Sequence, residues 1–152
     1  MSTTENKVIY VTPVIDTAVY ASGDLIADTT EIPFAVTHIG GSSRFLSLNI
    51  QDAGAQAVAF KVYVMAVNKS FGTINSAPNI SDANITAAKV QAIIDIATSD
   101  WVTLSGSSMA SRTFEFPVKA VAQSLYFAIV NGAGGPDYVA ATDLVLGFGF
   151  AP

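Results

Sequence analysis

This sequence of 152 residues lacks cysteine and is poor in charge. Without cysteine the chain can form no disulfide framework, thiolate nucleophile or cysteine metal site. Only 12% of its residues are Asp, Glu, Lys or Arg, about half of the roughly 25% expected of a soluble domain, whereas 51% are hydrophobic. The surface must therefore consist largely of small and neutral polar residues. Cover by other protein favours such a composition, because interface cores are depleted in charge, but a neutral polar β-protein surface gives the same count.

Clustered basic residues and long apolar runs are missing as well. The seven Lys and Arg residues are scattered singly along a chain of net charge -5, so no basic patch is present to neutralise phosphates. No apolar run approaches the roughly 20 residues of a membrane helix, and the start, MSTTENK, lacks the basic and apolar regions of a secretory signal. We therefore expect a soluble protein made in the cytoplasm, with neither nucleic acid nor a membrane as partner.

Strand signals occupy most of the sequence. Short β-branched and aromatic runs are separated by Gly, Pro, Asn, Asp and Ser, the residues that favour turns. In several runs the apolar residues alternate with small or polar ones, as in strands with one buried face. We predict strands at Lys7–Thr12, Thr17–Ala21, Glu31–Ile39, Ser42–Gln51, Ala57–Val67, Asp100–Ser105, Ser108–Lys119, Ser124–Asn131 and Thr142–Phe150. Gly147 and Gly149, on the polar face of the last strand, suggest that another backbone lies close there.

Two stretches in the middle of the chain define its expected organisation. The stretch Phe45–Val67 is predicted to form two neighbouring antiparallel strands joined by a short loop at Asp52–Gln56. The sequence ITAAKVQAIIDIA, Ile85–Ala97, carries the only helical signal, because its apolar residues gather roughly on one side of a 3.6-residue wheel. Ser81 or Asn84 could cap this helix.

The number and spacing of these elements predict the fold class. About nine strands at intervals near ten residues, with one helix in a long connection, fit an all-β fold far better than an α/β fold. We predict an antiparallel β-sandwich of jelly-roll type with one short helix in a mid-chain connection. Residues 12–152 would form a single sandwich domain, and residues 1–11 an N-terminal arm or first strand.

The residues that could carry chemistry are few and do not converge. The only histidine, His38, lies at the end of a predicted strand, where a packed or surface role is more common than a catalytic or metal-binding one. Most acidic residues fall at turns, where Asp initiates turns and caps helices. A pair of carboxylates that meets only in space stays open, but no element favours it. We predict no catalytic residue, no cofactor and no metal, and hence no enzyme.

Several segments resemble a family of known proteins. The series YASGDLIADTTEIPFAVTHIGGSSRFLSLNIQD, AFKVYVMAV, NSAPNISDANITAAKVQAIIDIATSDWV and GGPDYVAATDLVLGFGF is similar to the small structural proteins of tailed-bacteriophage virions. The resemblance covers roughly residues 20–150 and consists of the residues at turns and strand ends. It implies a capsid decoration, or cement, protein of β-sandwich form, often trimeric, that bridges neighbouring capsomers on the capsid surface of the virion. The implied partners are the major capsid protein and copies of the chain itself.

A decorating role requires interface residues, and the sequence offers several candidates. An N-terminal arm containing VIYV could add a strand to a neighbouring sheet edge. Apolar residues within the predicted strands are expected to point outward, although either face of the sandwich could be the core. The candidates are Val8, Ile9 and Tyr10 in the arm, Phe45, Tyr63 and Met65 in the strands, and Phe71 in a loop.

The alternative prediction is a binding module associated with a phage tail or fibre that recognises a host-surface glycan. Aromatic side chains could line a sugar-binding face, namely Tyr20, Phe71, Trp101 and Tyr138. Core or interface packing is the more common use of each.

Overall fold

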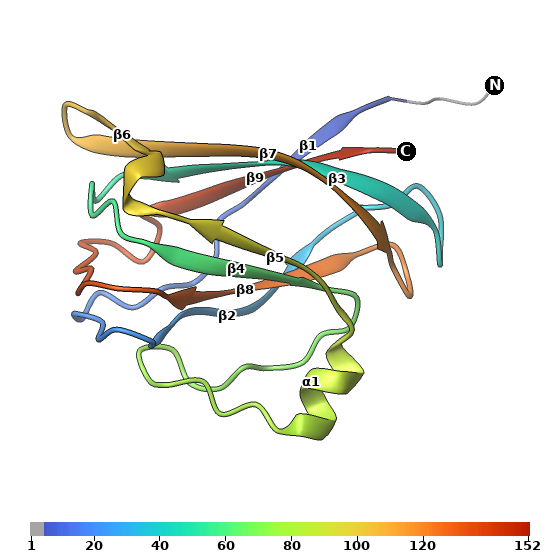
Figure 1. The fold of residues 1–152 in the computed structure, drawn as a ribbon, viewed down its shortest axis with the longest axis horizontal. Helices are drawn as coiled ribbons and strands as arrows, with labels where there is room; N and C mark the ends of the chain where they lie inside the picture. Colours follow the sequence, from blue (N-terminus) through green and yellow to red (C-terminus); the bar gives the residue numbers. More distant parts are fainter. Residues whose placement is uncertain (1–4) are drawn as a thin grey trace.

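Two antiparallel sheets pack face to face in the computed structural model, which describes residues 5–152 (Figure 1). Sheet A contains, in spatial order, β1 (Lys7–Val11), β9 (Leu144–Ala151), β3 (Ser42–Asp52), β7 (Ser107–Lys119) and β6 (Trp101–Leu104). Sheet B contains β2 (Leu25–Ile32), β8 (Leu125–Asn131), β4 (Phe60–Met65) and β5 (Val90–Ile96). The prediction of an all-β antiparallel sandwich with one short helix in mid-chain is confirmed.

The core lies between the sheets and is built by alternation along each strand. In β9 the side chains of Leu144, Leu146, Phe148 and Phe150 are all buried, because every second residue of a strand faces the same side. Phe148 of sheet A meets Phe127 of sheet B with 4.8 Å between ring centroids. Such aromatic pairs contribute about 0.5–1.5 kcal/mol beyond the area that they bury.

The two strands of the Phe45–Val67 stretch are not neighbours, contrary to the prediction. β3 pairs with β7 and β9 in sheet A, whereas β4 pairs with β5 and β8 in sheet B. The connection at residues 53–59 therefore crosses from one sheet to the other. Both strands face the same core from opposite sides, and for this reason their alternation patterns look alike in the sequence.

The predicted helix Ile85–Ala97 is half helix and half strand. Helix α1 spans Asp82–Ala88, and β5 follows at Val90–Ile96. Lys89 between them adopts a left-handed conformation with φ of 54°, and this ends the helix. The wheel analysis failed because the β-branched residues of β5 also alternate with period two, and pairing with β4 fixes them as a strand. Ser81 is the cap, since its side chain accepts the backbone N–H of Asn84.

Two predicted strands are mostly loops, and β2 was missed in addition to β5. Residues 17–21 contain no strand, and of Glu31–Ile39 only the first two residues belong to β2. Pro33 and Phe34, the latter at φ of 55°, end β2 and turn the chain. β2 was missed because its central residues are polar. Register shifts interrupt its pairing with β8 and so disturb the alternation of buried and exposed side chains.

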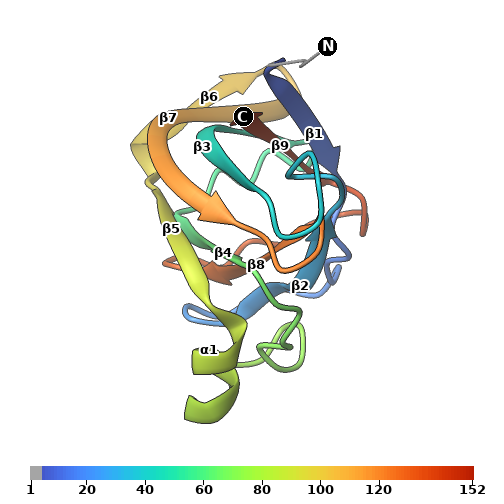
Figure 2. The same ribbon diagram turned by 90° about the vertical axis from the view of Figure 1, so that its right-hand side faces the viewer.

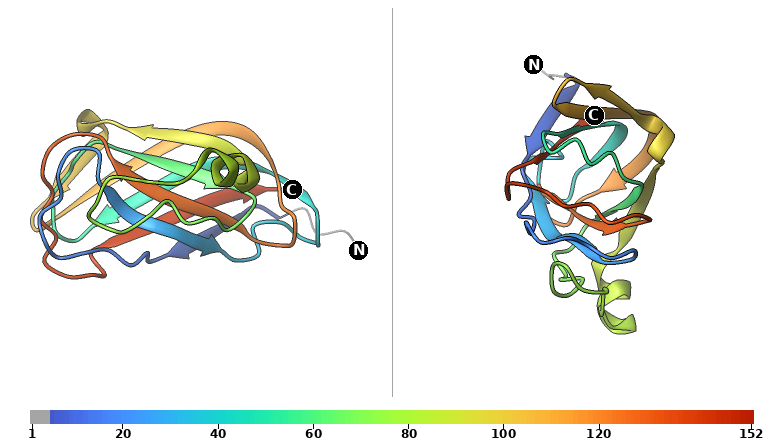
Figure 3. Two further views of the ribbon diagram at one scale, coloured as in Figure 1. Left: turned by 90° about the horizontal axis from the view of Figure 1, so that it is seen from below. Right: turned by 90° about the vertical axis from the view of Figure 1, so that its left-hand side faces the viewer.

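The long connection between β4 and β5 covers the outer face of sheet B (Figure 2). Seen from below, α1 and the loop before it lie in front of that sheet (Figure 3, left). A second apolar cluster fills the space beneath them and contains Leu25, Met65, Phe71, Ala88 and Ala128. A short 3-10 helix, η1 (Thr98–Asp100), then leads the chain from β5 back to sheet A. Among residues 5–152, no segment covers the outer face of sheet A in this way.

The predicted N-terminal arm is in large part a strand of the sandwich. Residues 7–11 form β1, which pairs antiparallel with β9 at the edge of sheet A, and Ile9 packs against the core. The start of the arm, residues 1–4, lies outside the described residues. Residues 7–11 therefore follow the first-strand alternative of the prediction. Because β1 lies at the edge of sheet A with a partner strand on one side, addition of this segment to a neighbouring sheet stays a prediction.

The left-handed junction at Lys89 yields a stability prediction. Replacement of Lys89 by Gly should stabilise the fold by about 0.5–1 kcal/mol, because glycine adopts positive φ without the steric cost of a Cβ atom. The same replacement at Lys69, which has no positive φ, should lower stability by about 0.5–1 kcal/mol through the greater freedom of the unfolded chain. Urea denaturation of both variants measures the difference, and equal effects at the two sites would contradict the explanation.

Candidate interaction surface

The described residues offer no obvious catalytic or metal-binding centre. Within residues 5–152, no group of three or more His, Cys, Asp or Glu is arranged to hold a metal ion. His38 lies in a turn, not at a strand end, and its Nδ1 is 3.1 Å from the Thr37 hydroxyl. The helices of this part of the chain are too short and too polar to cross a membrane. The outer surfaces of the two sheets are the other candidate sites of function.

The structure separates the predicted interface residues into exposed and buried ones. Val8 and Tyr10 are exposed on β1, and the ring of Tyr10 retains 69% of its accessible area. Ile9 points the other way and packs against the core. The expectation that Phe45 points outward is wrong, because it is fully buried and stacks on Phe150 in the core.

Of the remaining three candidates, Tyr63 and Met65 lie beneath the connection between β4 and β5, the insertion, and Phe71 belongs to it. Met65 and Phe71 are buried in the second apolar cluster, and Tyr63 is half-buried beside Phe71 at 5.4 Å between ring centroids. Met65 is thus outside the sandwich core but not at the surface, which corrects the expectation that it is exposed. Sequence alternation shows which face of a strand a residue occupies, but it does not show whether another segment covers that face.

The outer face of sheet A carries exposed apolar and neutral residues, and its charged residues Arg44 and Glu115 pair with each other at 3.1 Å. Three rows of paired residues cross it from β1 toward β6. The first row is Val8, Gly149, Ser47 and Thr113; the second is Tyr10, Gly147, Asn49 and Ser111; the third is Val145, Gln51, Met109 and Val102. None of the three rows contains a charged residue. The sequence prediction missed Val102, Leu104 and Met109 as surface residues, although the alternation in WVTL was a usable signal.

Glycines in β9 make room for side chains on this face. A Cβ atom on Gly147 would lie 2.9 Å from the Tyr10 ring, and one on Gly149 would lie 2.1 Å from the Ser47 hydroxyl. The Tyr10 ring thus lies against bare backbone, an arrangement that compensates for glycine in a sheet. The prediction that the glycines admit another backbone is corrected, because side chains of the adjacent strands occupy the space.

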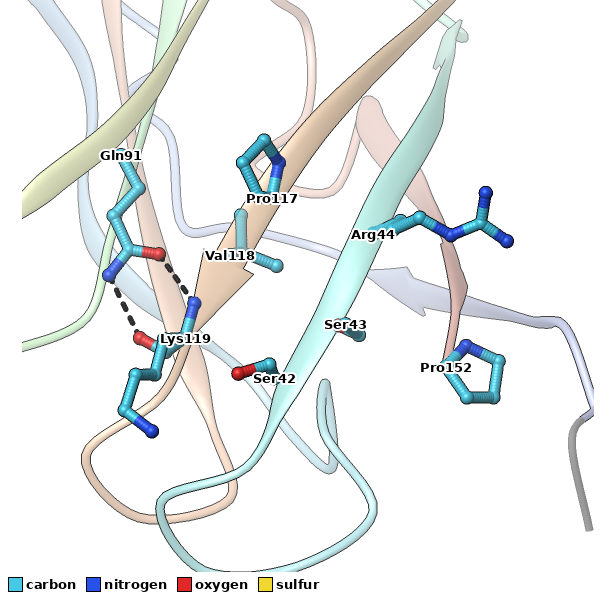
Figure 4. Close-up of a pocket in the computed structure, with 8 residues that line it drawn as sticks. All are labelled: Ser42, Ser43, Arg44, Gln91, Pro117, Val118, Lys119 and Pro152. Atoms are coloured by element: carbon cyan, nitrogen blue, oxygen red, sulfur yellow. Dashed lines mark hydrogen bonds between the residues drawn. The ribbon is translucent and has the colours of Figure 1, made fainter.

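A hollow of about 380 Å³ lies at the end of the sandwich where β3 begins and β7 ends. Figure 4 shows the eight residues that line it. The Gln91 side chain of β5 bridges the two sheets there, since it accepts the Lys119 N–H and donates to the Lys119 carbonyl, both at 2.8 Å. Arg44 pairs with Glu115 at 3.1 Å, and the Lys119 amine donates to the Gly40 carbonyl. Both cations therefore have partners, and the Gln91 contact is structural.

Two carboxylates meet at the opposite end of the sandwich. Asp52 is fully buried and accepts the backbone N–H groups of Gly54, Gln56 and Ala57 at 2.8–3.2 Å. Asp143 accepts two N–H groups of its own loop. A Cβ atom on Gly54 would lie 2.9 Å from the Asp143 carboxylate and 3.3 Å from that of Asp52. Since each acid is used as an acceptor for loop backbone, this pair explains the loop conformations and suggests no acid–base chemistry.

The aromatic residues proposed for a sugar-binding face are not available for that purpose. Tyr20, Phe71 and Tyr138 are buried, and burial raises the pKa of Tyr20 to about 12. Desolvation and the nearby carboxylates also raise the pKa of Tyr138. Trp101 is half-buried, and its indole N–H donates to the Val58 carbonyl at 2.9 Å.

Comparisons with known proteins add no family to this picture. No protein-family model matches the chain, and a search of curated proteins finds no significant match.

The Asp52 carboxylate generates a pH prediction. Burial raises its pKa, with the negative charge of Asp143 as a smaller contribution, while the three N–H donors oppose the shift. An acid with a raised pKa binds its proton more tightly in the folded state, so its contribution to stability falls as pH rises from its unfolded pKa to its folded pKa. Replacement of Asp52 by Asn should cost about 1–3 kcal/mol, because an amide NH₂ cannot accept the N–H groups now bound by the carboxylate.

The stability gap between the wild type and the Asp52→Asn variant should therefore be largest near pH 4 and should narrow toward pH 7. Urea denaturation of both proteins across this range measures the gap. A gap that widens with pH would show that ionisation of Asp52 stabilises the fold.

Proposed function

We propose that this chain is a non-enzymatic decoration protein of a bacteriophage capsid, made in the host cytoplasm and located on the capsid surface of the virion. It binds the major capsid protein, bridges neighbouring capsomers and stabilises the shell, and it associates with copies of itself. The outer face of sheet A carries the proposal, because three rows of residues across it contain no charge and include Tyr and Met, a composition typical of protein interfaces. The resemblance of the sequence to phage virion proteins supports the same function.

The proposal includes a jelly-roll classification of the sandwich. Its support is the pairing order, in which β1 pairs with β9, β2 with β8, β3 with β7 and β4 with β5. A chain that pairs its first strand with its last, its second with the one before, and so on inward folds like a long hairpin wrapped across two sheets. Jelly rolls recur in viral capsid proteins and in lectins.

The mechanism that we propose is mechanical. A sandwich with a continuous core behaves as a rigid body, and each contact with the shell can be modest on its own. Several such contacts on one rigid body act together, because once the first has formed the others form at high effective concentration. The sum would raise the barrier to separation of neighbouring capsomers.

The residues that motivated the glycan-binding alternative are not exposed for sugar binding. Tyr20, Phe71 and Tyr138 are buried, and Trp101 is half-buried with its N–H engaged. It remains an outcome of the experiment that locates the protein on the particle.

Two measurements on phage particles test the proposed function. Gold-conjugated antibody to this protein should label the whole head surface of intact particles. Particles that lack the protein should release their DNA at a lower temperature than complete ones, because the bridging contacts are gone. Label confined to the tail or fibres would favour the binding module, and unchanged heat stability together with unlabelled heads would reject decoration.

A further inference from the structure

We propose that the end of the sandwich at Asp52 and Asp143 binds one divalent cation of the Ca²⁺ type. Asp52 ends β3 and Asp143 directly precedes β9, and Asp52 pairs with Leu144 in the ladder between these two strands. The Ala53 N–H also donates to the Asp143 carbonyl at 2.9 Å. Backbone contacts therefore hold the two acidic residues side by side.

The two carboxylates face a common space beside Gly54. A Cβ atom on Gly54 would lie 2.9 Å from an Asp143 oxygen and 3.3 Å from an Asp52 oxygen, with the Tyr138 ring at 3.5 Å. Ca²⁺ bonds to oxygen at about 2.3–2.6 Å. One ion placed between the two oxygens therefore contacts both after a small rotation of the Asp143 side chain, which lies outside the strands.

No cationic side chain balances these two acids within residues 5–152. Asp52 is fully buried and Asp143 is 9% exposed, yet neither takes part in any of the three ion pairs of this part of the chain. The loop N–H groups stabilise each carboxylate singly, but they do not cancel the repulsion between the two. Buried charges in proteins are paired or coordinate metals. A divalent cation supplies the balancing charge for both acids at once.

Two buried hydroxyl groups near the acids have no hydrogen-bond partner within the described residues. They are the hydroxyls of Ser108 and Tyr138, which are 0% and 1% exposed. Ser108 stands directly opposite Asp52 in the β3–β7 ladder, and both are buried, so their side chains are neighbours on the inward face. Unpaired buried polar groups are rare and point to a bound water or ion. A water would satisfy the hydroxyls but leave the two negative charges unbalanced, whereas a cation accounts for both.

The donor atoms select the class of ion. Carboxylate and hydroxyl oxygens suit hard cations, whereas Zn²⁺ and Cu²⁺ favour histidine and cysteine ligands. The chain has no cysteine, and its histidine, His38, lies in the loop before β3, at the other end of the strand that Asp52 closes. Ca²⁺ accepts irregular sets of six to eight oxygens, water included, whereas Mg²⁺ requires a regular octahedron. With two carboxylates only, binding should be weak, with a dissociation constant of about 10⁻⁴–10⁻³ M.

This inference goes beyond the proposed function and departs from the sequence-based expectation of a chain without a metal. It concerns the purified chain and needs no capsid. Its failure would leave decoration to the particle experiments, and failure of those experiments would leave the cation site standing. The pH dependence predicted for Asp52 belongs to the metal-free protein, because a bound cation would replace the proton.

Titration calorimetry of the chelator-treated chain with CaCl₂ tests the site directly. The wild type should bind one ion per chain, and Ca²⁺ at about 10 times its dissociation constant should lower the unfolding constant about 10-fold. Asp143→Asn should lose both responses, because it removes one of the two charges. Asp137→Asn is the matched control and should keep them, since Asp137 is an exposed acid of the same loop.

Ser108→Ala should change stability in opposite directions without and with the ion. In EDTA the variant should be at least as stable as the wild type, because a buried hydroxyl without a partner is removed. In CaCl₂ it should be the less stable of the two, because the ion has lost an oxygen ligand. Urea denaturation in both buffers measures the reversal, and it tests the site even if Asp143→Asn does not fold.

Each alternative result overturns the proposal. No heat and no change in stability with CaCl₂ up to about 10 mM, ten times the weakest expected constant, shows that the acids hold no cation. Equal responses of Asp143→Asn and Asp137→Asn place the ion elsewhere. Equal effects of MgCl₂ and CaCl₂ on the wild type assign the stabilisation to screening of the net charge of -5. Equal stabilisation of Ser108→Ala and the wild type by Ca²⁺ removes the hydroxyl from the site.

Discussion

The buried Asp52 carboxylate holds one of the corners at which the chain crosses from one sheet to the other. β3, the central strand of sheet A, ends at this residue, and within the next seven residues the chain enters β4 of sheet B. Backbone in such a corner has lost its ladder partners, and buried N–H groups without acceptors are costly. Asp52 supplies acceptors for three of them, and two non-glycine residues at positive φ, Ala55 and Ala57, turn the chain between them. Since β3 and β4 each contact two strands, the position of both sheets depends on this corner.

Much of the fold could be predicted from period-two alternation, and the failures have a common cause. Ser42–Gln51 and Thr142–Phe150 are strands in the structure, with their apolar residues in the core, as their patterns indicated. Alternation does not state which strand lies beside which, so β3 and β4 were taken for partners. It also cannot separate a short helix followed by a strand from one longer helix when apolar residues continue from one into the other, as in Ile85–Ala97.

The interface candidates show the same limit at the level of single residues. Val8 and Tyr10 lie at the surface, but Phe45 belongs to the core and Met65 and Phe71 are covered by residues distant in sequence. The pattern reports the two faces of a strand correctly and leaves open which face meets the other sheet. The asymmetry that results, with the outer face of sheet B covered in part by the insertion and that of sheet A without such a cover among residues 5–152, appears only when the chain is folded.

The Gln91 side chain at the edge of β5 acts there as a substitute for a peptide group. It offers one donor and one acceptor to Lys119 in the same pairing that a neighbouring strand would offer. An unpaired strand edge is a template on which other chains can add and aggregate. The amide therefore occupies the place that an extending strand would need at the end of β7, and it does so with a side chain, leaving the backbone of β5 free to pair with β4. Contacts between copies of the chain at this end are then limited to surfaces other than the strand edge.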